Sequence, residues 1–383
     1  MNKRLILAIN PGSTSTKIAL YEEEKELFST NISMTPEMLA DFKTINDSYD
    51  FRKKMIVQEV EKHGYRMQDI GYYACRGGKM APTEGGVFRV NPKMLEDGPL
   101  DRPVPHPLLL SPHFGNDFAK TYGGEAFTLN QQRTDEYSDL ARMTGLHDVF
   151  RQSAIHTLNH KEVGARAAAK LGKRYDEAEL IIAHLGGGIS LAAHHKGRMI
   201  DGTHSGYGDG PMATSRSGSL TVYTVLEMAY SGQFTFAELG KRVAQTGGLL
   251  DHLGTVDARE VEQRIANGDA YAKLVYDTML YQICKHIGSM AAVLEGKAEA
   301  IVLTGGMANS TYVVEEIRKR TGWIAPIMVM AGEYEMEALA LGVLRALRGE
   351  AEIKEYTGEP VFTPKEFLKK YGVEVHPEDK FYY

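Results

Sequence analysis

Residues 180–194 read LIIAHLGGGISLAAH, two apolar runs on either side of three consecutive glycines. Runs of β-prone apolar residues that flank a glycine turn predict two strands, here over 180–185 and 189–194. Residues 5–21 read LILAINPGSTSTKIALY and show the same arrangement about 175 positions earlier. Because helical and strand patterns follow each stretch, the recurrence predicts a duplicated α/β domain.

The composition excludes several classes of protein. Of the 383 residues, 43% are hydrophobic and 25% are charged, which is typical of a globular chain of two or three domains. The net charge of -6, with 44 Lys and Arg against 50 Asp and Glu, argues against a nucleic-acid partner. No apolar run is long enough to span a membrane, no secretory signal pattern follows Met1, and there are only two cysteines. We therefore expect a cytoplasmic enzyme without a membrane partner.

Three glycine-containing turns follow predicted strands, at residues 10–13 (NPGS), 184–188 (HLGGG) and 303–306 (LTGG). Glycine lets a backbone approach a ligand closely, and the amides of a tight turn can form an anion-binding concavity. None of the three turns has the Walker A or the dinucleotide-binding pattern. Each turn alone is more often structural, but the three together indicate a phosphate-binding protein.

Four motifs resemble those of acetate and butyrate kinases: INPGSTSTK at 9–17, CRGG at 75–78, HLGGGIS at 184–190 and LTGGMA at 303–308. The variants are more similar to butyrate kinases, and the resemblance runs from about residue 4 to about residue 348. It implies an α/β fold of the acetate and sugar kinase, Hsp70 and actin superfamily. In that fold, two duplicated RNase H-like (actin-like ATPase) domains have a nucleotide cleft between them.

The resemblance also implies a division of the chain and an activity. We expect an N-terminal RNase H-like acyl and phosphate domain over 1–152, a C-terminal nucleotide-binding and dimerisation domain over 153–348, and a peripheral extension over 349–383. The implied enzyme is an ATP-dependent carboxylate kinase, which transfers the γ-phosphoryl group reversibly to a straight or branched short-chain fatty acid. ATP or ADP and Mg²⁺ are the implied cofactors, and a homodimer or higher homo-oligomer is the implied assembly.

Two arginines are implied as catalytic residues. By resemblance, Arg76 in the CRGG motif would hold the substrate carboxylate, and Arg216 in TSRSG would stabilise the transferring phosphoryl group. Both tasks suit arginine, whose guanidinium offers paired donors and stays protonated. His106, in a Pro-rich stretch (97–112) predicted to form an irregular loop, aligns with a family histidine near the phosphoryl site.

A second histidine follows from the same resemblance. His156 and His160 are four residues apart on one face of a predicted helix, but the glutamate of a zinc-binding H-E-x-x-H motif is missing. Acetate kinases have a phosphoryl-stabilising histidine where His160 falls, whereas butyrate kinases usually have glutamine there. The resemblance therefore implies that His160 is a transition-state donor.

The nucleotide and the metal are assigned to residues of the glycine turns and of one acidic segment. Asn10 would orient the phosphates or the metal, and Ser13 and Lys17 would lie near the phosphates. Either Glu333 or Glu335 would reach Mg²⁺, although the start of a helix also favours acidic residues. The other implied cofactor-binding residues are His184, Gly186, Gly187, Gly188, Gly305 and Gly306.

One position departs from the family pattern where the chemistry is demanding. Asn130 occupies the place of an aspartate that helps to position the metal, and an amide binds Mg²⁺ more weakly than a carboxylate. Asp135 and Asp139 are close enough in sequence to replace it. Residues 206–211 and the apolar loop at 106–110 also differ from the family.

These departures keep two alternatives open. One is an ATP-binding paralogue with reduced or lost kinase activity, and the other is a kinase for a different carboxylic acid. A sugar kinase or an Hsp70-like chaperone is less favoured, because the motifs around Arg76 and Arg216 resemble those of acyl kinases.

Overall fold

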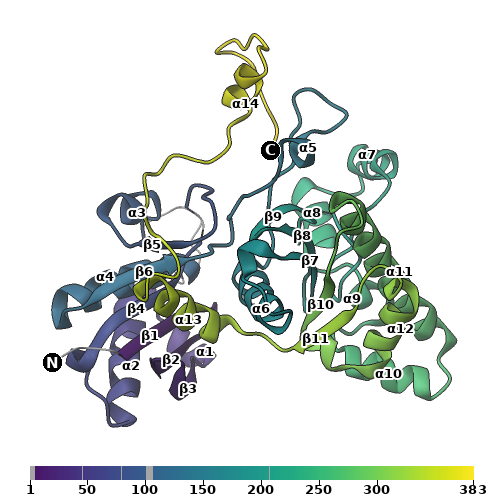
Figure 1. Ribbon diagram of the computed structural model, residues 1–383. Helices are drawn as coiled ribbons and strands as arrows, with labels where there is room; N and C mark the ends of the chain where they lie inside the picture. The colour runs from purple at the N-terminus through teal and green to yellow at the C-terminus, as the bar shows by residue number, and fades with distance from the viewer. Residues whose placement is uncertain (1–4, 45, 79, 101–106, 207) are drawn as a thin grey trace. The chain divides into compact units, whose positions relative to one another are not determined.

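The computed structural model describes residues 5–44, 46–78, 80–100, 107–206 and 208–383 (Figure 1). The chain forms two compact units. Unit 1 comprises Met1–Asp135 and Tyr334–Glu374, and unit 2 comprises Glu136–Glu333 and Val375–Tyr383. The division differs from the expected boundaries at residues 152 and 348, because the chain returns to unit 1 near its C-terminus.

Unit 1 contains a seven-stranded sheet in the order β12-β5-β6-β4-β1-β2-β3. β1, β2 and β3 form an antiparallel meander, and β4 and β6 extend it with parallel pairing on the other side of β1. The strand bounds are β1 Leu5–Pro11, β2 Ser15–Glu22, β3 Lys25–Ser33, β4 Ile70–Arg76, β5 Val87–Arg89, β6 Glu125–Leu129 and β12 Ile353–Glu355.

Helices cover both faces of this sheet. α2 (Tyr49–Lys62) and α4 (Leu110–Tyr122) share an apolar core with one face, and a Cβ on Gly115 of α4 would meet Cys75. α13 (Glu335–Leu347) packs on the opposite face, where Gly342 contacts Leu129 of β6. The remaining helices of unit 1 are α1 Pro36–Leu39, α3 Pro92–Asp97 and α14 Pro364–Lys370, with 3-10 turns at Asn46–Ser48, Met67–Asp69 and Pro107–Leu109.

Two sequence predictions in unit 1 need correction. The Pro-rich stretch 97–112 is not an irregular loop throughout, because α4 already begins at Leu110 and contains Pro112 in its first turn, where a proline is tolerated. The segment after residue 348 is not wholly peripheral, because β12 pairs in parallel with β5. Tyr356 just after β12 is buried, and its hydroxyl donates to Asp97 at 2.9 Å.

Unit 2 contains a five-stranded sheet in the order β11-β10-β7-β8-β9. An antiparallel meander (β7, β8, β9) is again extended by two parallel strands, so the order repeats β6-β4-β1-β2-β3 of unit 1. The predicted duplication of an α/β domain is thereby confirmed. The strand bounds are β7 Glu179–Leu185, β8 Ile189–His195, β9 Arg198–Gly202, β10 Ala300–Gly305 and β11 Ile327–Ala331.

Alternation along the strands of unit 2 separates an apolar face from a face that also carries polar side chains. Odd-numbered residues such as Ile181 and Leu191 join the core formed with α11 (Ala270–Val293) and α12 (Thr311–Thr321). Even-numbered polar residues such as His184 and Ser190 face α6 (Thr157–Lys170), with which they form hydrogen bonds. The other helices are α5 Asp139–Arg142, α7 Val222–Tyr230, α8 Phe236–Ala244, α9 Leu249–Leu253 and α10 Ala258–Ala266, with 3-10 turns at Tyr175–Glu177 and Gly306–Asn309.

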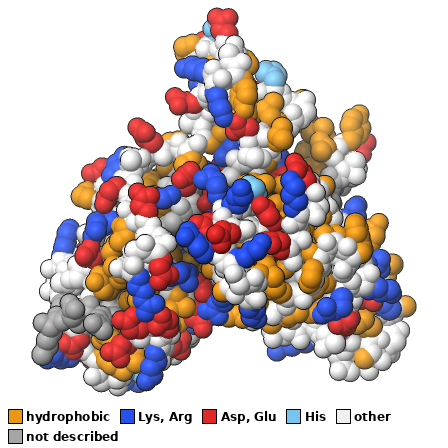
Figure 2. Space-filling model, viewed as in Figure 1, with side chains coloured by type: hydrophobic (Ala, Val, Ile, Leu, Met, Phe, Trp, Pro, Cys, Tyr) orange, Lys and Arg blue, Asp and Glu red, His pale blue; other side chains and the backbone are white. Residues whose placement is uncertain are grey.

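Charged side chains of both signs are interspersed over the face of the molecule shown in Figure 2. Among the described residues, no helix is both long and apolar enough to cross a bilayer.

Candidate active site

A buried arginine donates hydrogen bonds to the turn between β1 and β2. Arg52 on α2 is 1% exposed, and its Nη1 donates to the carbonyl oxygens of Gly12 (2.9 Å) and Ser15 (3.1 Å). Its Nη2 donates to the carbonyl oxygen of Ser13 at 2.7 Å, and its Nε donates to Oγ of Ser48 at 2.8 Å. Burial lowers the pKa of the Arg52 guanidinium to about 10. Three carbonyls of the turn are thus oriented toward Arg52, which the sequence analysis did not single out.

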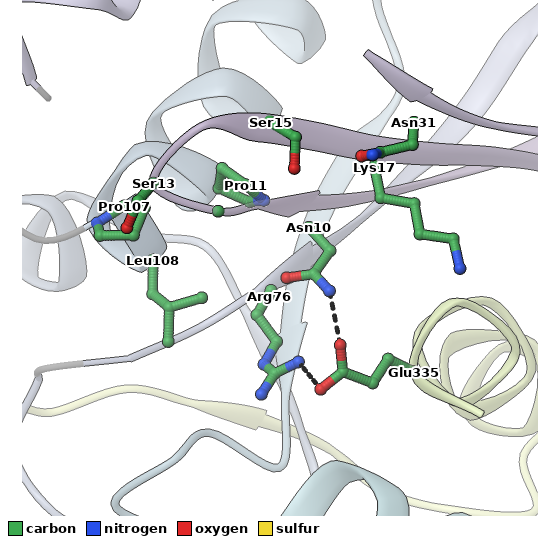
Figure 3. A pocket seen from close by; sticks show the side chains of 11 residues that line it. Asn10, Pro11, Ser13, Ser15, Lys17, Asn31, Arg76, Pro107, Leu108 and Glu335 are labelled. Atoms are coloured by element: carbon green, nitrogen blue, oxygen red, sulfur yellow. Dashed lines mark hydrogen bonds and ion pairs between the residues drawn. The ribbon is translucent and has the colours of Figure 1, made fainter. Parts of the chain in front are cut away.

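Three predicted residues meet at the ends of β1 and β4. Nδ2 of Asn10 donates to Oε2 of Glu335 at 2.7 Å, and Arg76 forms an ion pair with Oε1 of the same carboxylate (Figure 3). The side chains of Arg76 and Glu335 are 14% and 29% exposed. Nε of Arg76 is buried and has no acceptor among the described residues. A buried donor without a partner is costly, so this nitrogen is suited to a ligand oxygen.

A cavity of about 570 Å³ opens beside these side chains. In Figure 3, Pro107 and Leu108 lie on the side of the cavity away from Glu335, and the β1–β2 turn lies above Arg76. The lining residues are Asn10, Pro11, Gly12, Ser13, Ser15, Lys17, Asn31, Arg76, Pro107, Leu108 and Glu335. The cavity therefore brings together five residues that the sequence analysis assigned to the acid, the phosphates or the metal, and adds an apolar wall.

The donor set at Asn10 and Glu335 is compatible with Mg²⁺. Both side chains carry oxygen atoms, and Mg²⁺ is commonly bound by one or two carboxylates together with substrate phosphates and water. Among the described residues, no three His, Cys, Asp or Glu side chains converge to form a metal cage. Of the two candidate glutamates, Glu335 is the one beside Asn10, whereas Glu333 is exposed and is assigned to unit 2.

Asn130 lies at the end of β6 and serves the backbone. Its φ of 43° is in the left-handed region, which asparagine tolerates better than most residues. Its side-chain Oδ1 accepts from the backbone amide of Gly86 at 2.9 Å, and the backbone amide of Asn130 donates to the Gly86 carbonyl at 3.1 Å. Asn130 is not among the residues that line the cavity described above. His106, which was also predicted to be catalytic, lies outside the described residues.

In unit 2, the turn at Gly186, Gly187 and Gly188 joins β7 to β8, as predicted. A Cβ on Gly188 would overlap the guanidinium of Arg216, so the two groups are in direct contact. Arg216 also donates to the carbonyl of Ser205, and burial lowers the pKa of this arginine. Because Gly188 has no side chain, the guanidinium of Arg216 can lie against the backbone of the turn.

His184 lies just before this turn and contacts Asn159 of α6. Its Nδ1 is 3.2 Å from Oδ1 of Asn159, which also accepts from Oγ1 of Thr304 at 3.2 Å. Nδ2 of Asn159 is buried without a partner among the described residues. Gly305, with a φ of +87°, approaches the backbone of Leu185 so closely that a Cβ would clash there. The third glycine turn, which continues into Gly306, is therefore packed against the second.

The structure changes the interpretation of the two helix histidines. His160 is fully buried, and its ring nitrogens contact Oγ of Ser190 (3.1 Å) and Nε2 of His194 (3.2 Å). It is therefore in no position to donate directly to a phosphoryl group. His156 is only partly buried, contacts Ser190 through Nδ1 at 2.8 Å and stacks on His184 with a centroid distance of 4.2 Å. Burial places His160 behind Ser190 and leaves His156 beside the glycine turn.

Comparison with solved structures defines the class of the fold. The chain is similar to acetate kinase from Porphyromonas gingivalis, with 19% identity, a TM-score of 0.73, and 90% of this chain and 99% of that chain covered. It is also similar to a propionate kinase from Francisella tularensis subsp. tularensis SCHU S4, with 20% identity, a TM-score of 0.68, and 88% of this chain and 98% of that chain covered. For acetate kinase from Entamoeba histolytica, the identity is 14% and the TM-score is 0.71, and the alignment covers 88% of this chain and 98% of that chain. The chain thus has the two duplicated RNase H-like domains of the actin-like ATPase fold.

The family follows from the sequence of the second unit. The model of the acetokinase family matches residues 130–324, just over half of the chain. The chain belongs to the acetokinase family, whose members are ATP-dependent carboxylate kinases.

Proposed function

We propose that this chain is a butyrate kinase-like enzyme that transfers the γ-phosphoryl group of Mg-ATP to a short-chain fatty acid, straight or branched, in a reversible reaction. The observation that carries the proposal is the position of Arg76. Among the residues that the structure describes, its buried Nε has no acceptor, and Arg76 lines a cavity that Leu108 also lines. A carboxylate with a short apolar tail satisfies both features.

The acid is recognised by charge at one end and by apolar contact at the other. Arg76 binds the carboxylate through Nε and the free edge of its guanidinium, since a carboxylate offers two oxygens to paired N–H donors. Pro107 and Leu108 contact the alkyl tail. Each buried methylene adds about 0.8 kcal/mol, so an apolar wall favours an acid longer than acetate.

We assign the phosphoryl group to residues of unit 2. Arg216 and the backbone of the turn at 186–188 would stabilise the charge of the transferring group, together with His156. His184, Gly305 and Gly306 are assigned to the nucleotide. Such charge stabilisation by pre-positioned donors is the main contribution that proteins make to phosphoryl transfer.

The reaction needs no general base. A carboxylic acid has a pKa of about 4 to 5, so its oxygen is already an anionic nucleophile at neutral pH. That oxygen attacks the γ-phosphorus, a new O–P bond forms, and the bond from γ-phosphorus to the β,γ-bridging oxygen breaks to release ADP. Bound Mg²⁺ would neutralise charge on the phosphates, and Glu335 and Asn10 are the residues that would hold it. Ser13 and Lys17 would contact the phosphates.

The surface of unit 2 supports a homo-oligomer. The described residues of α7 are all partly or fully exposed, and several of them are large and apolar. Val222, Tyr223 and Tyr230 are 74%, 73% and 88% exposed, and Phe236 at the start of α8 is 96% exposed. Exposed apolar clusters of this kind mark protein interfaces. We therefore propose that this part of unit 2 contacts a second copy of the chain in a homodimer or higher homo-oligomer, and light scattering of the purified protein tests the oligomeric state. We also propose that the enzyme is cytoplasmic.

The activity is tested by incubating purified protein with Mg-ATP and straight or branched acids of two to six carbons. Hydroxylamine traps the acyl phosphate as a hydroxamate. We expect turnover to peak at butyrate or isobutyrate. A peak at acetate would contradict the proposed chain length, and a peak at an acid outside this series would favour a kinase for a different carboxylic acid.

The environment of Asn130 favours a second candidate, an ATP-binding paralogue with reduced or lost kinase activity. Its amide oxygen accepts from Gly86, and its amide group replaces the negative charge implied by the family. No turnover with any acid, combined with thermal stabilisation by ATP, would support this candidate. Asn130→Asp then distinguishes the two: restored turnover identifies a decayed kinase, whereas an active wild-type enzyme that is little changed shows that this position is not decisive.

A further inference from the structure

Five polar side chains form a continuous row between α6 and β8 in unit 2. Oη of Tyr175 lies 2.6 Å from Nδ1 of His194, and Nε2 of His194 lies 3.2 Å from Nδ1 of His160. Nε2 of His160 lies 3.1 Å from Oγ of Ser190, which lies 2.8 Å from Nδ1 of His156. We call this row, from Tyr175 to His156, the histidine relay.

The relay follows from the periodicity of the two elements that carry it. His156 and His160 are one helical turn apart, and Ser190 and His194 are both on the even-numbered face of β8. Tyr175 reaches the end of the row because its ring lies across Gly164 of α6, where a Cβ would come within 2.6 Å of the ring.

The inner members of the relay are neutral. His160 and His194 are fully buried, and burial lowers the pKa of both imidazoles well below 6.5. The ammonium group of Lys161 lowers both pKa values further; it is held by the carboxylate of Glu136 at 2.7 and 2.8 Å. Burial raises the pKa of Tyr175 well above its usual value. Each imidazole therefore carries one proton, and the tyrosine keeps its own.

A row of neutral groups can be polarised in only two directions, and Tyr175 selects one of them. Among the described residues, its hydroxyl meets no acceptor other than Nδ1 of His194. If Tyr175 donates to His194, the proton of His194 lies on Nε2 and is donated to His160. His160 then donates from Nε2 to Ser190, and Ser190 donates to His156. The opposite direction would leave the tyrosine O–H unsatisfied, at a cost comparable to a lost hydrogen bond.

We infer that Tyr175, His194, His160 and Ser190 are positioning residues that fix His156 as the neutral tautomer with its proton on Nε2. The stacking of His156 on His184 also favours a neutral ring, because two adjacent imidazolium ions would repel each other. This inference rests on the proposed function for its consequence. His156 then donates its Nε2–H to the transferring phosphoryl group without first having to gain a proton.

The test is the protonation state of His156, read by long-range ¹H–¹⁵N correlation spectra of the full chain labelled with ¹⁵N-histidine at pH 7.5. The signal is assigned by its loss in His156→Gln. We expect a protonated Nε2 and an unprotonated Nδ1 in the wild-type protein. A proton on Nδ1, or an imidazolium with both nitrogens protonated, would overturn the inference.

The role of the distal tyrosine is tested by Tyr175→Phe, which removes only the hydroxyl. We expect His156 to become a mixture of tautomers and kcat to fall about 10-fold, with unchanged KM for both substrates, because the charge-stabilising donor is lost in part of the molecules. Tyr137→Phe is the matched control. It removes a buried hydroxyl in the same unit that donates to the Gly202 carbonyl at 2.8 Å, outside the relay.

The outcomes separate this inference from the proposed function. An Nε2-protonated His156 in a protein without kinase activity would refute the proposed function and leave the relay in place. A Tyr175→Phe variant with an unchanged His156 tautomer would refute the relay even if the kinase is active. If Tyr175→Phe does not fold, the wild-type spectrum still decides the direction of the relay.

Discussion

Arg76 and Glu335 are 259 positions apart in sequence, and their side chains form an ion pair in unit 1 between the end of β4 and the first turn of α13. The same carboxylate accepts from Asn10. The proposed acid-binding arginine and the proposed metal-binding glutamate are thus direct partners, so Glu335 and a substrate carboxylate would use different donors of one guanidinium.

Loss of this arginine is expected to affect the acid far more than the nucleotide. For Arg76→Met, kcat/KM for butyrate should fall by about 10² to 10³, which is typical when a charged donor to the reacting groups is removed. Steady-state kinetics with each substrate varied in turn provide the measurement, and KM for ATP should stay near the wild-type value. Arg89→Met is the control, since Arg89 is a half-exposed arginine of the same sheet. An unchanged kcat/KM in Arg76→Met would remove Arg76 from the site.

The apolar wall is expected to set the chain length of the acid. Leu108→Ala enlarges the cavity beside Arg76, so the ratio of kcat/KM for hexanoate to that for butyrate should rise about 10-fold, within the range that one or two methylenes contribute. Leu108→Phe should shift the preference in the opposite direction. Hydroxamate formation across the acid series measures both shifts, and parallel shifts in the two variants would show that Leu108 does not contact the tail.

The glycine turn of unit 2 is expected to depend on contact with Arg216. In Gly188→Ala the new methyl group would occupy the position of the guanidinium. Displacement of Arg216 should lower kcat about 10- to 100-fold, because a small misplacement of a donor costs much of its effect. Gly288→Ala, in α11, has open space around the added methyl group and serves as the control. A wild-type kcat in Gly188→Ala would show that Arg216 need not remain beside the turn.

Much of the fold follows from local sequence patterns. The two hairpins were predicted because apolar runs flank glycine turns, and β7 and β8 begin and end within one residue of the predicted ranges. The position of α13 was not predictable in this way. Its apolar face indicates that it packs against a sheet, but its contacts with β1, β4 and β6, such as that of Gly342 with Leu129, are needed to show that the sheet is in unit 1.

The sequence predicts the motif residues of the candidate site but not the residues that hold them in place. Asn10 and Arg76 were found because they end strands within recognisable motifs. Arg52 was missed because an arginine within a helical pattern is usually exposed, and nothing local reveals that three turn carbonyls converge on it. The spacing of His156 and His160 predicted that both lie on one face, but it could not show that both rings contact Ser190, which is 30 positions from His160.

The buried Arg52 is expected to stabilise both the fold and the first turn. Arg52→Met leaves the carbonyls of Gly12, Ser13 and Ser15 without this donor. The free energy of unfolding should therefore fall by roughly 2–4 kcal/mol, since each lost hydrogen bond from a charged donor costs about 1.5–3 kcal/mol and removal of the buried charge offsets part of the loss. Urea denaturation gives the free energy, and Arg66→Met, which removes an exposed arginine of unit 1, is the control. A loss below about 1 kcal/mol would mean that water replaces the guanidinium.

The buried imidazoles are expected to make the stability of the protein depend on pH. Burial holds the pKa of His160 and His194 well below 6.5 in the folded state, whereas both rings titrate near 6.5 when the chain is unfolded. Below pH 6.5 the unfolded state therefore binds more protons than the folded state. The free energy of unfolding falls as the pH falls, by up to about 1.4 kcal/mol per pH unit for each histidine. The loss continues down to the folded-state pKa values.

His160→Gln isolates one of these two contributions, because glutamine keeps hydrogen-bonding groups but does not titrate. Between pH 7.5 and 5.5, the fall in unfolding free energy should be smaller than in the wild-type protein by about 1.4 kcal/mol in total, because the His160 ring of the unfolded chain becomes mostly protonated over this range. Denaturant titrations at several pH values measure the slope, and His147→Gln, which removes an exposed imidazole of unit 2, is the control. If His160→Gln retains the full wild-type slope, His160 must already gain its proton in the folded state. The relay would then be charged, and Tyr175 could no longer set its direction.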